Sequence, residues 1–107
     1  MNLQKNGVNS TKKTKTKIRP LFIGFGKQAL EYAKVMHYYK INIESVFVRN
    51  LKKNRKNFYN FKIKNIYNNI DQALNEKKYN CVFVFLPWNI IENKISKIIK
   101  LTKKPIF

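Results

Sequence analysis

Cysteine, glycine, acidic residues and long hydrophobic runs are all scarce in this 107-residue chain, and most of these scarcities exclude a class of protein. The single cysteine, Cys81, can form neither a disulfide framework nor a cysteine-based zinc site. The longest apolar run, residues 81–88, is far shorter than the roughly 18 residues of a membrane-spanning helix. The polar N-terminal stretch lacks the apolar segment of a secretory signal. We therefore expect a cytoplasmic protein that does not contact membranes.

What remains is enough for one folded domain. Hydrophobic residues make up 44% of the chain and aromatic residues 14%, which suffices for a single buried core at this length. Residues 1–16 are polar, basic and without periodicity, so they are predicted to form a disordered tail. Residues 17–107 are predicted to form the domain.

The chain is strongly basic, with 23 Lys and Arg against five Asp and Glu and a net charge of +18. Such a charge is typical of proteins that bind nucleic acid, so a small basic nucleic-acid-binding module is one hypothesis. However, Lys, Asn and Ile supply 48 of the 107 residues, as an AT-rich codon bias would produce without any polyanionic partner. The five acidic residues are scattered and form no predicted metal site. Charge alone therefore does not identify a function.

Strand-like and helix-like segments alternate along the domain. Short apolar runs predict buried strands, and apolar residues three and four positions apart predict helices. Strands are expected at 18–24, 42–48, 61–66, 81–86 and from 105 onward; helices are expected at 27–39, within 50–57, at 70–77 capped by Asn68 or Asn69, and over about twelve residues capped by Asn89. This order predicts an α/β fold with a doubly wound parallel sheet of the Rossmann type.

Two of the three glycines lie in one turn, Gly24-Phe-Gly-Lys-Gln-Ala29, between the first strand and the first helix. In a dinucleotide-binding G-x-G-x-x-A turn, the first glycine permits the tight bend and the second lets a pyrophosphate approach the backbone. The phosphates then face the N-terminus of the helix. We predict that Gly24, Phe25, Gly26, Lys27 and Gln28 bind a cofactor. The alternative is an ordinary strand-to-helix turn that binds no ligand.

The end of the second strand bears on the choice between NAD and NADP. An acidic residue there would bind the ribose of NAD, but Glu44 lies at the wrong end of the strand. Arg49 occupies the expected position, with Lys52 and Lys53 close behind, and an arginine suits the 2′-phosphate of NADP. NADP is therefore favoured over NAD, unless Arg49 is simply another basic surface residue.

With these motifs in place, residues 18–107 resemble the N-terminal half of the Gfo/Idh/MocA oxidoreductases, the family of glucose–fructose oxidoreductase and inositol dehydrogenase. The resemblance rests on the glycine turn, on the strand Asn80-Cys-Val-Phe-Val-Phe-Leu-Pro87 with the helix after it, and on Lys103-Lys-Pro-Ile-Phe107. It implies an NAD- or NADP-binding Rossmann domain followed by a second domain for a sugar or polyol-like substrate. It also implies that Leu86, Pro87 and Trp88 lie beside the nicotinamide.

The sequence departs from that family at three points. Arg49 replaces the usual Asp, and Ile91 replaces a common histidine. The Glu-Lys-Pro motif, which carries the family's catalytic lysine, is expected directly after Phe107 and is not reached. We therefore expect a domain that binds cofactor without turnover, lacking the catalytic half. Its uncovered sheet face and free sheet edge favour self-association.

Overall fold

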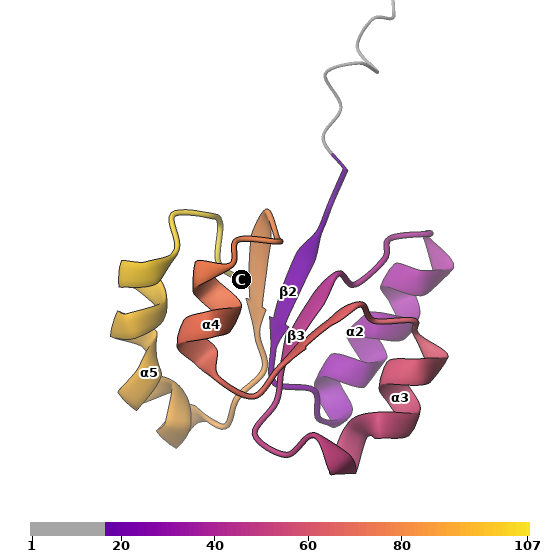
Figure 1. The fold of residues 1–107 in the computed structure, drawn as a ribbon, viewed down its shortest axis with the longest axis horizontal. Coiled ribbons are helices and arrows are strands. Elements are labelled where there is room, and N and C mark those ends of the chain that lie inside the picture. The colour runs from indigo at the N-terminus through magenta and orange to yellow at the C-terminus, as the bar shows by residue number, and fades with distance from the viewer. Residues whose placement is uncertain (1–16) are drawn as a thin grey trace, which may run out of the picture.

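The structure, a computed structural model, describes residues 17–107 (Figure 1). The predicted tail at 1–16 lies outside the described residues. Within them, four parallel strands form a sheet in the order β4-β3-β2-β5. They are β2 (Pro20–Ile23), β3 (Ser45–Phe47), β4 (Asn65–Tyr67) and β5 (Cys81–Val84). The chain adds strands on one side of β2 and then crosses to its other side, so the predicted α/β class is confirmed.

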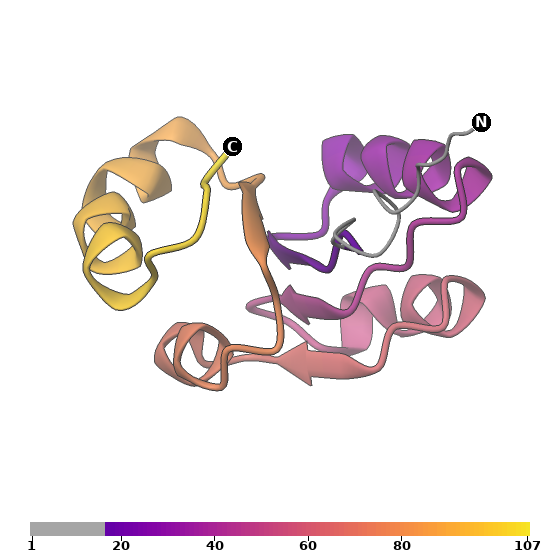
Figure 2. The ribbon, with the colours of Figure 1, turned by 90° about the horizontal axis from the view of Figure 1, so that it is seen from above.

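Helices cover both faces of the sheet (Figures 1 and 2). The first pair is α2 (Lys27–Tyr38) and α3 (Arg55–Asn60), which follows the short 3-10 helix η1 (Lys52–Asn54). The second pair, on the opposite face, is α4 (Ile70–Asn75) and α5 (Trp88–Leu101). Ala29 and Ala33, one turn apart on α2, are both fully buried, and their small side chains let that helix lie close to the sheet.

Alternation along β2 divides the core into two clusters. Leu21 and Ile23 belong to a cluster that includes the fully buried Ile98 of α5. Phe22 points to the other face and packs with Ala29 and Ala33. β2 is buried at every position because it lies in the middle of the sheet between β3 and β5. The described residues contain no helix long and apolar enough to cross a membrane.

The expected strand at 61–66 is wrong for most of its length. Helix α3 runs to Asn60, and the Ile63 N–H then donates to the Phe58 carbonyl at 3.1 Å while Lys62 adopts a positive φ of 54°. The alternating apolar residues of this stretch therefore pack a helix end onto the core. The strand itself, β4, covers only Asn65–Tyr67.

Two helix starts and the last strand were also predicted, with different outcomes. Asn69 caps α4 as expected, since its side chain accepts a hydrogen bond from the Gln72 N–H at 3.0 Å. The expected cap at Asn89 is wrong: α5 already begins at Trp88, with Pro87 as its N-cap. The expected fifth strand is reduced to one parallel bridge between Ile106 and Val82.

Candidate functional site

The carboxyl ends of β2, β3 and β5 meet around a groove of about 580 Å³. In open α/β sheets, ligands bind in the crevice where the strand order reverses, and this groove lies there. Its lining residues come from three separate segments: Gly24, Phe25, Gly26 and Gln28; Phe47, Val48, Arg49, Asn50, Lys53 and Asn54; and Phe85, Leu86 and Pro87.

Gly24 is constrained by the protein around it. It adopts a φ of +100°, a conformation that side-chain-bearing residues rarely take. Its N–H donates to the Phe47 carbonyl at 2.8 Å, which ties the turn to β3. A Cβ at this position would lie 2.8 Å from the Phe85 carbonyl oxygen, so only glycine fits between β2 and β5.

Gly26 is open where Gly24 is crowded. It is the N-cap of α2, with an ordinary φ of −85°, and a Cβ added to it would meet no atom within 4 Å. No side chain among residues 17–107 caps this helix. The amides of the first turn of α2 and the partial positive charge of the helix N-terminus therefore remain available to an anion.

Phe25, between the two glycines, anchors the turn. Its side chain is buried, and its ring centroid lies 5.6 Å from that of Phe58 on α3 and 6.1 Å from that of Phe22 on β2. The loop therefore presents backbone to the groove and directs its one large side chain into the core.

The wall after β3 is polar and basic. The Asn50 side chain accepts hydrogen bonds from the N–H groups of Lys52 (3.1 Å) and Lys53 (3.3 Å), which fixes the start of η1 beside Arg49. Arg49 and Lys53 both line the groove and are exposed. Arg49 also lines a shallower polar hollow of about 400 Å³ that includes Lys94 and Lys97 of α5.

The third wall follows β5. The Phe85 N–H donates to the Ile23 carbonyl at 2.8 Å, which extends the strand pairing to the edge of the groove. Leu86 and Pro87 then line it. Trp88 begins α5, has a 73% exposed side chain and lies outside the lining.

Seven of the nine predicted site residues therefore line one groove; Lys27 and Trp88 do not. The prediction did not include Asn50, Lys53, Asn54 or the strand-end residues Phe47, Val48 and Phe85 as site residues. Residues 50–54 show no periodicity in the sequence. The signal that pointed toward them was the expected distance along the chain from the glycine turn to the end of the second strand.

The described lining of the groove has basic side chains that can bind an anion, but no side chain suited to proton transfer. Among residues 17–107, the titratable side chains that line it are the basic ones of Arg49 and Lys53. No cluster of three potential metal ligands occurs within residues 17–107. The only histidine, His37, is exposed at the end of α2, and burial raises the pKa of the Cys81 thiol. This arrangement suits an elongated anionic ligand.

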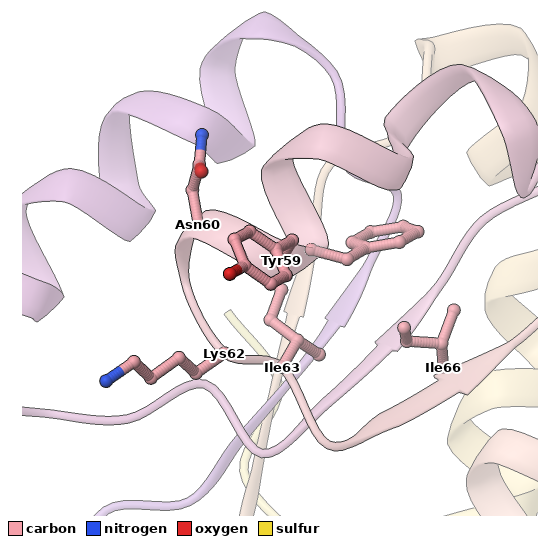
Figure 3. Close-up of a pocket in the computed structure, with 6 residues that line it drawn as sticks. Tyr59, Asn60, Lys62, Ile63 and Ile66 are labelled. Carbon is pink, nitrogen blue, oxygen red and sulfur yellow. The ribbon is translucent and has the colours of Figure 1, made fainter.

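A second hollow, of about 490 Å³, lies beside α3 and the edge strand β4 (Figure 3). Phe58, Tyr59, Ile63 and Ile66 give it an apolar lining, and Figure 3 shows the Lys62 amine directed away from Ile63 and Ile66. With no converging polar groups to orient a ligand, it is not a comparable candidate.

The strand order and the glycine turn define a Rossmann-type α/β domain, the class found in nicotinamide-dependent dehydrogenases. Two particular structures that share the fold are of scyllo-inositol dehydrogenase from Lactobacillus casei. The apo enzyme matches with a TM-score of 0.72 over 85% of this chain, and the enzyme with bound NAD(H) and scyllo-inositol matches with a TM-score of 0.74 over 86%.

Sequence identity to both structures is 12%, so the likeness is one of fold. The chain spans 27% of the length of these dehydrogenases. No family model matches the sequence, and no curated protein sequence matches it. The predicted resemblance to the inositol dehydrogenase group is therefore confirmed at the level of the fold.

Proposed function

We propose that this chain binds a nicotinamide dinucleotide in the groove at the carboxyl ends of β2, β3 and β5. The observation that carries the proposal is the open space at Gly26, where a ligand can approach the backbone at the uncapped N-terminus of α2. Gly24 supports it, because the bend that presents this backbone needs a glycine. A bound NAD(H) in a structure of the same fold provides independent support.

The walls of the groove suggest where the phosphates and the nicotinamide of the cofactor would lie. The pyrophosphate would lie against Gly24, Phe25, Gly26 and the first turn of α2, with Lys27 and Gln28 at its side. The nicotinamide would lie by Leu86 and Pro87, with Trp88 near the opening. The bound cofactor would supply hydride transfer, whereas this chain's residues bind and orient it.

We infer that NADP is preferred to NAD. Arg49 and Lys53 share the wall after β3, and the hollow beyond Arg49 adds Lys94, whereas Lys97 in that hollow is paired with Asp71 at 3.2 Å. Charge-assisted hydrogen bonds from arginine and lysine favour an additional phosphate. Among residues 17–107, no carboxylate lines the groove where a ribose diol would be held.

We further propose that the domain belongs to an oxidoreductase for a sugar or polyol-like substrate. A neighbour in fold binds scyllo-inositol, a polyol, and is nearly four times as long as the matched segment. Because no proton-transfer group lines the groove, residues 17–107 are expected to bind cofactor without oxidising a substrate. Dehydrogenase activity of the 107-residue chain would contradict this.

The test is a fluorescence titration of the chain with NADPH and NADH in 0.15 M salt. Gly26→Val should abolish binding, because its side chain fills the space above the α2 N-terminus. Lys34→Val, an exposed change on the same helix, is the matched control and should bind normally. Arg49→Gln should weaken NADPH binding by about tenfold while leaving NADH unchanged.

The same titration includes a short RNA, because the net charge supports nucleic-acid binding as the rival. RNA binding that falls steeply with salt, persists in Gly26→Val and is accompanied by no NADPH or NADH binding would contradict the proposal. Circular dichroism of each variant checks that the fold is retained.

A further inference from the structure

Three tyrosines are exposed at the ends of two neighbouring helices. Tyr38 and Tyr39 lie at the end of α2 and are 79% and 68% exposed, and their rings meet edge-on with centroids 5.1 Å apart. Tyr59, one residue before the end of α3, is 84% exposed. Single aromatic residues are common on a protein surface, but a group of them in one place is typical of a binding surface.

The ends of α2 and α3 lie close together. The ring of His37, in the last turn of α2, meets the ring of Phe61, directly after α3, edge-on with centroids 5.9 Å apart. Figure 1 shows both helices on the same face of the sheet. The three exposed tyrosines are therefore grouped on one surface.

A lysine follows each of these helix ends. Lys40 and Lys62 adopt positive φ values of 61° and 54°. The Lys40 N–H donates to the His37 carbonyl at 3.0 Å. In the same way, the Lys62 N–H donates to the Tyr59 carbonyl at 3.1 Å. Because these turns satisfy carbonyls at the helix ends, the exposed amines of Lys40, Lys62 and Lys64 give the surface its charge.

This charge is not neutralised by ion pairs within the described part of the chain. The three ion pairs among residues 17–107 do not include Lys40, Lys62 or Lys64. The sequence has no acidic residue between Glu44 and Asp71, and Glu44 is half-buried. The exposed lysines therefore attract an anionic partner.

The hollow of about 490 Å³ beside α3 belongs to this surface. Tyr59 and Lys62 line it together with the apolar residues Ile63 and Ile66 (Figure 3). Without converging polar groups, it does not select a particular small molecule. A nucleobase does not need such groups, because an aromatic ring holds any base by stacking, and a neighbouring amine can bind its phosphate.

We propose that this surface binds single-stranded nucleic acid without sequence preference. Bases would stack on the three exposed tyrosines, and the phosphates between them would contact Lys40, Lys62 and Lys64. Aromatic rings beside a basic surface are the usual means by which proteins hold a single strand. A polyanion without bases would make only the lysine contacts.

The surface is separate from the groove at the carboxyl ends of the strands. Helix α2 begins at that groove, with Gly26 as its N-cap, and its 12 residues extend about 18 Å along the helix axis. Strand β4, beside the hollow, is also the sheet edge opposite β5, which Ile106 adjoins. Nucleic acid and dinucleotide should therefore bind together, and either proposal can fail without the other.

The experiment is a fluorescence-anisotropy titration of a labelled, unstructured 12-nucleotide RNA with the 107-residue chain in 0.1 M salt. Tyr59→Ala should weaken binding about tenfold, whereas Tyr59→Phe keeps the ring and should bind normally. Lys62→Gln should weaken binding about fivefold. Lys100→Gln removes the same charge from α5 and is the matched control, with an expected loss of less than about twofold. Circular dichroism checks that each variant is folded.

Two further ligands separate base stacking from charge. Binding of inorganic polyphosphate should fall in Lys62→Gln and remain unchanged in Tyr59→Ala. The same 12-nucleotide sequence as DNA shows which nucleic acid binds more tightly, and the variants should rank alike with both.

The proposal would be overturned by an absence of nucleic-acid binding, or by binding that Tyr59→Ala does not weaken. Equal losses in Lys62→Gln and Lys100→Gln would also overturn it, as would displacement of the RNA by saturating NADPH. Gly26→Val should bind RNA like the unchanged chain, and Tyr59→Ala should bind NADPH like the unchanged chain.

Discussion

Gly24 and Gly26 lie in the same turn, yet the structure gives them different constraints. Gly24 has a positive φ and a backbone oxygen where its Cβ would be, whereas Gly26 has an ordinary φ and open space. Gly24→Ala should lower the free energy of unfolding by about 2 kcal/mol or more, and Gly26→Ala should change it by less than about 0.5 kcal/mol. Urea unfolding of both variants measures this. Equal losses would contradict the distinction.

Tyr67 links a strand to the end of a helix through its hydroxyl, which donates to Glu76 Oε1 at 2.7 Å. Burial, followed by the hydrogen bond to Glu76 and the charge of that carboxylate, raises the pKa of Tyr67 to about 12. The folded state thus holds this proton more tightly than the unfolded chain, where tyrosine titrates near 10. The contribution to stability is complete below pH 10 and is lost between pH 10 and 12.

Tyr67→Phe should therefore reduce stability at pH 8 and make its decline between pH 10 and 12 shallower than in the unchanged chain. The comparison is made by urea unfolding at several pH values, with the exposed Tyr59→Phe as the control. Parallel pH profiles for Tyr67→Phe and the unchanged chain would show that this hydroxyl is not responsible. On the acid side, the hydrogen bonds from Tyr67 and Gln72 lower the pKa of Glu76.

At the scale of elements, α5 shows how much a helical pattern predicts. The spacing of Ile91, Ile95, Ile98 and Ile99 predicts one apolar face, but only Ile98 is fully buried and Ile99 is 58% exposed. Ile98→Ala should cost about 2–4 kcal/mol of unfolding free energy, and Ile99→Ala less than about 1 kcal/mol. Thermal and urea unfolding provide the comparison, and equal costs would mean that α5 packs differently.

The buried strands and the glycine turn were predictable because their signals are local. Strand β5 is a continuous apolar run, and the turn after β2 holds two of three glycines. Helix ends were harder to predict. The residue with positive φ that ends a helix is usually a glycine, but here Lys40, Lys62 and Lys77 adopt this conformation after α2, α3 and α4. In a chain so poor in glycine, the usual stop signal is absent from the sequence.

The candidate site was predictable where a sequence motif or a strand end marks the position and not where side chains converge from a distance. Gly24 and Gly26 follow from the turn, and Arg49 follows from its place at the end of β3. Asn50, Lys53 and Asn54 reach the groove because Asn50 organises a short turn and η1. That turn rests on hydrogen bonds to the backbone, which the order of polar residues alone does not reveal.

At the scale of the whole molecule, like charges dominate. The described residues form three ion pairs, Lys34–Glu31, Lys78–Glu76 and Lys97–Asp71, all at the surface, against a net charge of +18. Self-repulsion destabilises such a chain, and salt screens it. The melting temperature should therefore rise by several degrees between 0.02 and 0.3 M NaCl. A fall with salt would mean that the few ion pairs outweigh the repulsion.

Because the groove is assembled from segments that follow β2, β3 and β5, no part of the chain can form it alone. Gly24 is hydrogen-bonded to Phe47 and packed against Phe85, about 60 residues further along the sequence. A ligand that contacts all three segments cannot bind a chain in which one of these segments is unfolded, so it binds only the folded domain. Ligand binding should therefore also slow hydrogen exchange of the slowest-exchanging amides of the sheet. A cofactor at 100 times its Kd would raise the free energy of global unfolding by about 2.7 kcal/mol.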